Sequence, residues 1–344
     1  MRKLLAALAA VATVATAAVA PAQAETRITG SGASFPFPIY SAWFKDFSSN
    51  NADGVTIDYQ SKGSGAGIQD LINGVVDFAA SDAAMKDEDI AKVANGVVLL
   101  PMTAGEIVLA YNLPGVTELK LPRAVYGDIF EGKIEKWNDP AIAAANPDAT
   151  LPDLPITVVV RSDSSGTTFN FTSHLAAIDP EFASTVGAGT SVQWPSINRV
   201  VKAPKNDGVT ATLLQTPGAI GYVEYGYAKL TGAPMATLEN AKGEFVAPGG
   251  EGGALALASA EFDSNMRAFI TDPQGDGAYP IATFTWMLFY KDGQDETKVK
   301  ALKDMIEYGL TTGQESAESL GYIPMPEAVI EKVRAAAQQI GASS

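Results

Sequence analysis

The pattern of hydrophobic and polar positions divides most of the chain into apolar strands that alternate with amphipathic helices. Residues 39–47 place aromatic and aliphatic side chains on one helical face, and residues 55–59 alternate as a half-buried strand. Further strands are predicted at 27–32, 75–80, 97–100, 106–111, 156–160, 219–225 and 281–290, further helices at 87–94, 206–214, 299–306 and 326–340, and a helix followed by a turn within 121–137. The Pro- and Asp-rich segment 139–155 is predicted to be a surface loop. Strands alternating with helices predict an α/β fold with parallel or mixed sheets.

Three of the predicted strands end in the same way. Near Ser34, Ser64 and Ser165, a strand runs into glycine with serine or threonine and then into a helix. The start of a helix carries unpaired backbone N–H groups and the positive end of the helix dipole, which together attract anions. Three such junctions in one chain therefore predict helix starts that converge on one anionic ligand.

The junction at residues 161–169, RSDSSGTTF, has the largest number of side chains that could bind an anion or support such binding. Arg161 directly follows the strand and can donate two hydrogen bonds to a tetrahedral oxyanion. Asp163 can hold the guanidinium group in place. Taken alone, the same residues also fit an ordinary strand–loop–helix junction with a serine cap, and the sequence of this segment leaves both interpretations open.

The first residues have the features of a secretory signal peptide. Arg2 and Lys3 precede an apolar run at 4–20, and Ala22 and Ala24 form an A-x-A cleavage site. Cleavage after Ala24 leaves 320 residues, enough for about two domains. The chain has no cysteine, so neither disulfides nor a lipid-modified cysteine can form. We expect an exported, periplasmic protein with a net charge of −17 after cleavage, which argues against nucleic acid and anionic membrane surfaces as partners.

Five segments together carry a resemblance to a known family. They are GSGASFPFPIY at 30–40, VDFAASD at 76–82, YGDIFEGKIEKW at 126–137, RSDSSGT at 161–167 and PGAIGYVEY at 217–225. In these segments and in their order, the chain resembles the periplasmic phosphate-binding proteins of high-affinity phosphate ABC transporters. The resemblance extends over nearly the whole chain after the signal peptide.

This resemblance implies a two-lobed clamshell of the type II periplasmic binding-protein fold, in which each lobe has a mixed or parallel sheet flanked by helices. Lobe I would comprise residues 25–108 and 282–344, lobe II residues 109–281, with two strands crossing between them. The implied phosphate contacts are Ser34, Phe35 through its backbone, Ser64, Asp82, Arg161, Ser165, Gly166 and Thr167, with Asp163 supporting Arg161. The implied protein is a monomer without cofactor, metal or catalytic residues, and its partners are the permease subunits and ATPase of a phosphate importer.

Asp82 would distinguish phosphate from sulfate. An ionised carboxylate can only accept hydrogen bonds, and phosphate near neutral pH keeps at least one proton to donate to it. Sulfate keeps none, so its oxygens would face Asp82 as an unpaired like charge. A mismatched buried polar group can reject the wrong ligand by ~10⁴-fold or more. Without the resemblance, Asp82 would be interpreted as a turn or cap residue after a strand.

Different classes of function compete with this interpretation. A secreted phosphatase would also hold phosphate with serine and arginine, but metal-dependent phosphatases need clusters of histidine and carboxylates. The single histidine, His174, lies on the apolar face of the helix that follows Arg161, where packing explains it, so a serine hydrolase triad lacks its base. A receptor for another oxyanion, such as sulfate or molybdate, and a structural surface protein also stay open as functions.

Overall fold

The computed structural model describes residues 26–195 and 197–341, so the predicted signal peptide lies outside the described residues. Within them, a mixed eight-stranded sheet and a three-stranded sheet carry the fold. The large sheet has the order β2 (Val55–Ser61), β1 (Thr26–Gly32), β3 (Phe78–Ser81), β11 (Ala282–Tyr290), β4 (Val97–Asn112), β8 (Ala219–Glu224), β6 (Thr157–Arg161), β7 (Val200–Ala203). The small sheet has the order β10 (Phe245–Val246), β9 (Thr237–Glu239), β5 (Lys120–Leu121).

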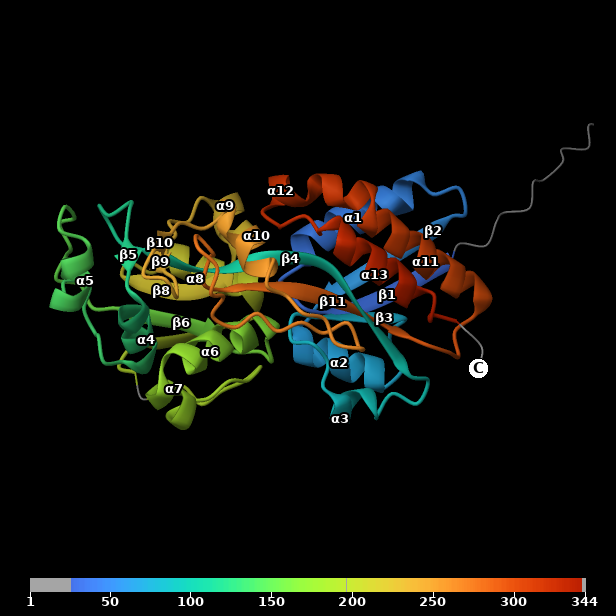
Figure 1. Ribbon diagram of the computed structural model, residues 1–344, viewed down its shortest axis with the longest axis horizontal. Helices are drawn as coiled ribbons and strands as arrows, with labels where there is room; N and C mark the ends of the chain where they lie inside the picture. The colour runs from blue at the N-terminus through green and yellow to red at the C-terminus, as the bar shows by residue number, and fades with distance from the viewer. Residues whose placement is uncertain (1–25, 196, 342–344) are drawn as a thin grey trace, which may run out of the picture.

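The long strand β4 joins the two halves of the molecule. Its first part pairs antiparallel with β11 up to Glu106, and from Ile107 it pairs antiparallel with β8. β1, β2 and β3 are mutually parallel on one side of this strand, as are β6, β7 and β8 on the other. Figure 1 shows β4 and β11 running lengthwise between the two halves. β4 therefore changes its pairing partner between Glu106 and Ile107, close to the predicted lobe boundary at 108/109. The boundary itself stays a prediction.

One prediction about β4 was wrong. Residues 97–100 and 106–111 were expected to be separate strands, but they belong to one strand that is buried along nearly its whole length. Pro101, which cannot donate a hydrogen bond to a neighbouring strand, lies opposite Trp286 where the register of the β4–β11 pair shifts. Such a bulge accommodates a proline without ending the strand.

The helices pack around both halves of the large sheet. In the residues predicted to form lobe I they are α1 (Phe37–Asn50), α2 (Ser64–Ile72), α3 (Asp87–Ile90), α11 (Glu296–Leu310), the 3-10 helix η1 (Thr312–Ser316), α12 (Ala317–Leu320) and α13 (Glu327–Ala337). In the residues predicted to form lobe II they are α4 (Arg123–Glu131), α5 (Pro140–Ala145), α6 (Gly166–Ile178), α7 (Pro180–Thr185), α8 (Lys205–Gln215), α9 (Tyr225–Thr231) and α10 (Gly252–Leu257).

Helix α5 corrects the prediction of an uninterrupted loop at 139–155. Asp139 accepts a hydrogen bond from the backbone N–H of Ala141 at 2.8 Å, and Pro140 occupies the first helical turn. An aspartate cap followed by proline favours the start of a helix. Here this local signal outweighs the loop-like composition of the segment.

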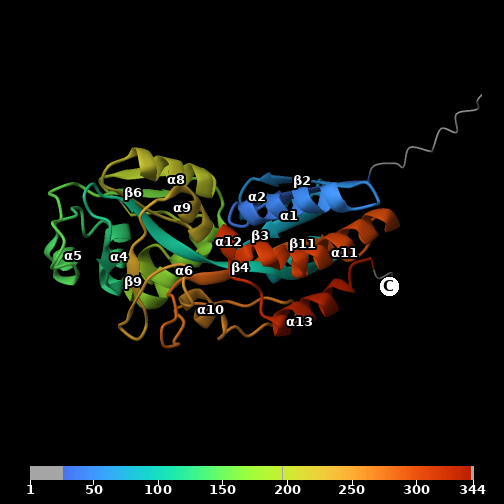
Figure 2. The same cartoon turned by 90° about the horizontal axis from the view of Figure 1, so that it is seen from above.

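The predicted aromatic helix face forms the core of lobe I. In α1 the side chains of Ile39, Tyr40, Trp43, Phe44 and Phe47 are buried. Seen from above, α11 lies between α1 and α13 (Figure 2). This packing positions the start of α1, three residues after Ser34.

Candidate functional site

The predicted site residues lie at the carboxyl ends of four strands. Ser34 follows β1, Ser64 follows β2, Asp82 follows β3, and Arg161 is the last residue of β6. Each of these residues is at least 94% buried. The carboxyl edge of parallel strands is where α/β proteins place their ligand sites. Hydrogen bonds from Gly166 to Ser64, and from Asn206 to Ser34 and Thr167, bring the three junctions together, while their convergence on an anionic ligand stays a prediction.

Helix α6 begins inside this group of residues. The Ser165 hydroxyl caps the helix by accepting a hydrogen bond from the backbone N–H of Thr168 at 3.0 Å. Gly166 and Thr167 form its first turn, and both are buried. The positive end of a helix of 13 residues is thus directed at the other site residues.

Arg161 is fixed by its neighbours. Its Nε donates to Asp163 Oδ1 at 2.8 Å, its Nη2 donates to Asp163 Oδ2, and its Nη1 donates to Thr167 Oγ1 at 3.2 Å. The side chain of Arg161 is 1% exposed and that of Asp163 is 16% exposed. Because a guanidinium group has five N–H donors, these bonds leave one N–H on Nη1 and one on Nη2 for an oxyanion.

Asp163 links the stability of the site to pH. Burial by itself raises the pKa of its carboxyl, but the hydrogen bonds and charge of Arg161 and the backbone N–H of Lys205 outweigh this effect and hold the pKa below its ordinary value of 3.8. A carboxyl whose pKa is lowered by folding stabilises the fold above its ordinary pKa, and this contribution is lost as the pH falls below that value.

We therefore expect Asp163→Asn to lower the free energy of unfolding at neutral pH. On acidification, the variant should then lose less of its unfolding free energy than the wild type does. Urea unfolding at both pH values measures this difference. As a control, Asp153→Asn removes an exposed carboxylate paired with Lys136 and should leave the pH dependence close to that of the wild type. Equal pH dependence in wild type and Asp163→Asn would contradict the prediction.

Ser64, Asp82 and Gly166 join the two predicted lobes. Ser64 Oγ accepts a hydrogen bond from the backbone N–H of Asp82 at 3.2 Å and another from the backbone N–H of Gly166 at 3.1 Å. Both lone pairs of this hydroxyl are occupied by N–H donors, so it can only donate its own proton, which is directed at Asp82 Oδ2 at 3.5 Å. A second bond across the lobes runs from Gly65 N–H to the carbonyl of Ser164 at 3.1 Å.

Gly166 allows this close approach because it has no side chain. A Cβ at this position would lie 2.6 Å from Ser64 Oγ and from Asp82 Cβ, well inside normal contact distance. Overpacking of this kind costs about 1–3 kcal/mol, so Gly166→Ala should weaken a ligand bound between the lobes about 10- to 100-fold. Calorimetric titration with phosphate measures the effect, and thermal unfolding without ligand measures how much of the cost falls on the fold itself.

The matched control for this substitution is Gly250→Ala, because a Cβ at Gly250 would meet no heavy atom within 4 Å. Its phosphate affinity should equal that of the wild type. A Gly166→Ala variant that also binds phosphate normally would show that the lobes do not need this contact.

The Asp82 carboxyl is held in one orientation. Thr285 on β11 donates its hydroxyl proton to Asp82 Oδ1 at 2.8 Å, which leaves Oδ2 facing Ser64 and Gly166. Burial raises the pKa of Asp82 to about 7, against the lowering effects of the Thr285 hydrogen bond and the Arg161 charge. The group therefore changes from acceptor to donor near neutral pH.

This pKa makes discrimination against sulfate depend on pH. Above about 7 the ionised carboxyl repels an oxyanion without protons, and below that value the neutral carboxyl can donate to it. We expect sulfate to compete with phosphate more strongly as the pH falls through 7. Competition titrations on either side of neutrality measure this, and a constant affinity ratio would contradict it.

Ser34 and Phe35 are tied to both lobes through their carbonyl groups. The carbonyl of Ser34 accepts a hydrogen bond from Tyr227 of α9 at 2.6 Å, and that of Phe35 accepts one from Tyr322 at 2.7 Å. The Ser34 hydroxyl accepts hydrogen bonds from Asn206, at the start of α8. The sequence predicted a helix start at 206 but not strand β7 before it, so this strand-to-helix junction was missed, and Thr285 had no predicted role because it lies within a strand.

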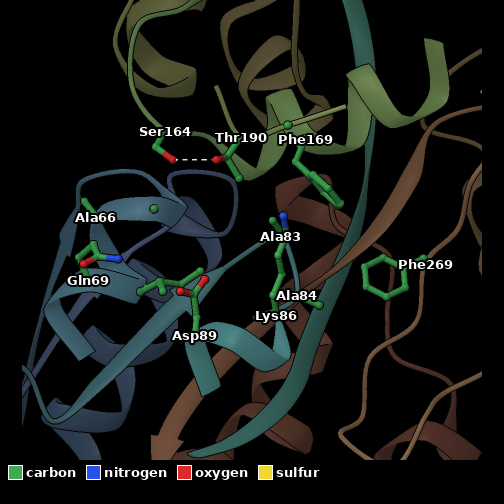
Figure 3. Close-up of a pocket in the computed structure, with 13 residues that line it drawn as sticks. Ala66, Gln69, Ala83, Ala84, Lys86, Asp89, Ser164, Phe169, Thr190 and Phe269 are labelled. Carbon is green, nitrogen blue, oxygen red and sulfur yellow. Dashed lines mark hydrogen bonds between the residues drawn. The ribbon is translucent and has the colours of Figure 1, made fainter. Parts of the chain in front are cut away.

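A cavity of about 540 Å³ lies beside the contact between the lobes (Figure 3). It is lined from lobe I by α2 and the segment after Asp82, and from lobe II by Ser164, Phe169 and Thr190. Ser164 Oγ donates to Thr190 Oγ1 at 2.9 Å, the bond drawn in Figure 3. None of the predicted phosphate contacts lines this cavity, because they are enclosed between the lobes themselves.

Comparisons with known proteins agree with this geometry. A family model described as "PBP superfamily domain" matches residues 16–310. The "Phosphate-binding protein PstS" of Pasteurella multocida is 42% identical over 317 residues, covering 91% of this chain and 90% of that protein. The protein of the same name from Methanocaldococcus jannaschii is 36% identical over 324 residues, covering 88% and 83% respectively.

Solved structures show the same fold. A high-affinity periplasmic phosphate-binding protein (PfluDING) bound with phosphate superposes with a TM-score of 0.74 at 22% identity, covering 90% of this chain and 93% of that chain. A phosphate-binding protein from Stenotrophomonas maltophilia gives a TM-score of 0.69 at 21% identity, covering 90% and 94%. At this identity the structures establish the fold alone, and they confirm the predicted two-lobed α/β architecture. Together with the identity to the curated relatives, they show that this chain belongs to the PstS family of phosphate-binding proteins.

Proposed function

We propose that this protein is an extracytoplasmic receptor that binds inorganic phosphate between its lobes and delivers it to an ABC-type importer. The phosphate contacts in this proposal are those of the predicted set: Ser34, Phe35, Ser64, Asp82, Arg161, Ser165, Gly166 and Thr167, with Asp163 as the support of Arg161. The names of the PstS relatives support the ligand.

One observation carries the proposal. The Asp82 carboxyl lies buried near the hydroxyls of Ser64 and Thr285 and under the influence of the Arg161 charge. Donors alone would suit any tetrahedral anion. A group that can accept a proton suits an anion that still carries one, and phosphate near neutral pH does. The ligand is held by hydrogen bonds and charge, and no bond in it needs to be made or broken.

The location and partners follow from the same proposal. Cleavage after Ala24 would release the chain into the periplasm, where it would act as a monomer and dock on the permease subunits, with the ATPase behind them. In the part of the chain that the structure describes, no helix combines the length and apolar character needed to cross a membrane.

The geometry gives a phosphatase little support. Burial lowers the pKa of His174 to about 4, and its Nε2 lies 2.8 Å from the hydroxyl of Tyr126. Along α6, His174 is roughly 13 Å from Ser165, too far to take the proton of that hydroxyl. The close group of Asp128, Glu131 and Asp179 resembles a metal site, but Lys133 Nζ lies 2.7 Å from Glu131.

A thermal unfolding experiment with two ligands separates receptor from phosphatase. Inorganic phosphate at about 100 times its dissociation constant should stabilise the mature protein by ~3 kcal/mol. The ester p-nitrophenyl phosphate should give no nitrophenol on incubation with the same protein. Release of nitrophenol that is lost on Ser165→Ala would support the phosphatase, and absence of any stabilisation by phosphate would overturn the receptor.

A further inference from the structure

Asn206 connects the two lobes at the centre of the site. It is the second residue of α8 in lobe II and is fully buried. Its amide Nδ2 donates to Ser34 Oγ of lobe I at 3.0 Å and to Thr167 Oγ1 of lobe II at 3.2 Å. Both acceptors are hydroxyl groups of the proposed phosphate contacts, whereas Asn206 itself is outside the predicted set.

The orientation of this amide is fixed by a backbone group. Asn206 Oδ1 accepts a hydrogen bond from the backbone N–H of Glu224 at 3.0 Å. A backbone N–H can only donate, so the oxygen of the amide must face Glu224. The amide nitrogen must therefore face Ser34 and Thr167.

This arrangement uses up the lone pairs of both hydroxyls. Ser34 Oγ accepts from the amide and from the backbone N–H of Asn206, the latter at 3.1 Å. Thr167 Oγ1 accepts from the amide and from Arg161 Nη1, each at 3.2 Å. A hydroxyl has two lone pairs and one proton, so a hydroxyl that accepts twice from N–H donors can offer only its proton to a third group.

We propose that Asn206 is a positioning residue that makes the Ser34 and Thr167 hydroxyls obligate donors to the bound oxyanion. This inference rests on the proposed function and deepens it. Because Ser34 belongs to lobe I and Asn206 to lobe II, the Ser34 hydroxyl is oriented only when the lobes meet. The site then gains its full set of donors on closure, which favours an acceptor-rich anion over solvent water.

Asn170, on α6, provides a matched comparison because its side-chain amide also bonds across the lobes. Its Nδ2 donates to the carbonyl of Asp82 across the lobes at 2.8 Å and to the carbonyl of Gly166 at 2.9 Å. It therefore holds the lobes together as Asn206 does. Carbonyl groups have no proton to orient, so Asn170 can stabilise closure without directing a donor.

The test is a pair of double-mutant cycles on phosphate binding, measured by calorimetry with ligand-stripped mature protein. Asn206→Ala should weaken phosphate binding about 10-fold in the wild-type background. In the Thr167→Val background it should cost clearly less, since one of the hydroxyls it orients is gone. Asn170→Ala should cost the same factor in both backgrounds. Thermal unfolding of the ligand-free variants separates losses of binding from losses of stability.

A second pair of variants covers the case in which Asn206→Ala does not fold. Asn206→Asp keeps the shape of the side chain but replaces the donating NH₂ with an acceptor, which draws both hydroxyl protons away from the ligand. It should weaken phosphate binding at least 10-fold more than Asn170→Asp, which adds the same charge.

The outcomes separate this proposal from the one on which it rests. Equal costs of Asn206→Ala in both backgrounds, or equal losses in Asn206→Asp and Asn170→Asp, would show that Asn206 is merely structural while phosphate binding stands. Failure of the wild-type protein to bind phosphate would instead overturn the proposed function itself.

Discussion

Replacing Asp82 with asparagine is expected to convert a phosphate-specific site into one that also binds sulfate. The amide has the shape of the carboxyl but carries no charge, and its NH₂ group can donate to an oxygen without a proton. Phosphate loses its proton acceptor, whereas sulfate loses a like charge that faces it. The ratio of phosphate to sulfate affinity should therefore fall by as much as ~10⁴-fold, the discrimination that a mismatched buried polar group can provide.

Titration of the variant with each anion at pH 8 measures this ratio, because the wild-type carboxyl, with its pKa of about 7, is then mostly ionised. Asp77→Asn is the matched control. Asp77 precedes the same strand, β3, but pairs with Lys298 at 2.7 Å outside the site, so its substitution should leave the ratio unchanged. An unchanged ratio in Asp82→Asn would remove Asp82 from its role in selectivity.

Replacing Arg161 with alanine should have the second large effect, on both binding and stability. The oxyanion loses its only proposed cationic partner, and truncation of a buried charge partner weakens binding by about 10³-fold. Asp163, 16% exposed, is left without its guanidinium, which costs about 3 kcal/mol of folding free energy. Calorimetry with phosphate and urea unfolding measure the two losses separately.

The double variant Arg161→Ala/Asp163→Ala distinguishes these losses. It removes the orphaned carboxylate, so much of the stability should return while phosphate affinity stays low. Arg161→Lys should keep the charge but lose the forked geometry, and its affinity should lie between those of wild type and Arg161→Ala. Recovery of phosphate binding in the double variant would contradict the role of Arg161 as the charge partner.

The sequence predicted most of the fold because its signals are local. The spacing of Ile39, Trp43 and Phe47 indicates a helix face without any knowledge of the partner, and the structure buries that face. The α/β fold and the family are confirmed. The continuity of β4 could not be predicted, because the bulge that accommodates Pro101 depends on pairing with β11, which comes much later in the chain.

Some residues of the candidate site could likewise be predicted from the sequence, and others could not. Serine at three helix starts and Arg161 after a strand are features of short segments, so the sequence indicates them, and the structure places them together. Thr285 lies within a strand, and strand β7 before Asn206 was not predicted, so both residues are recognised as part of the site only from the fold. Their partners are 203 and 172 residues away, and no local pattern indicates such pairings. The roles of the predicted contacts in binding phosphate stay a prediction.

The measurement that tests the central claim most directly is calorimetric titration of the ligand-stripped mature protein with phosphate and then with sulfate, at moderate salt and at pH 8, where the Asp82 carboxyl is mostly ionised. The account predicts tight binding of one phosphate per chain and no measurable response to sulfate. Sulfate binding comparable to phosphate binding would leave a general oxyanion carrier without selectivity from Asp82. Absence of phosphate binding would contradict both the proposed receptor function and the predicted phosphate contacts.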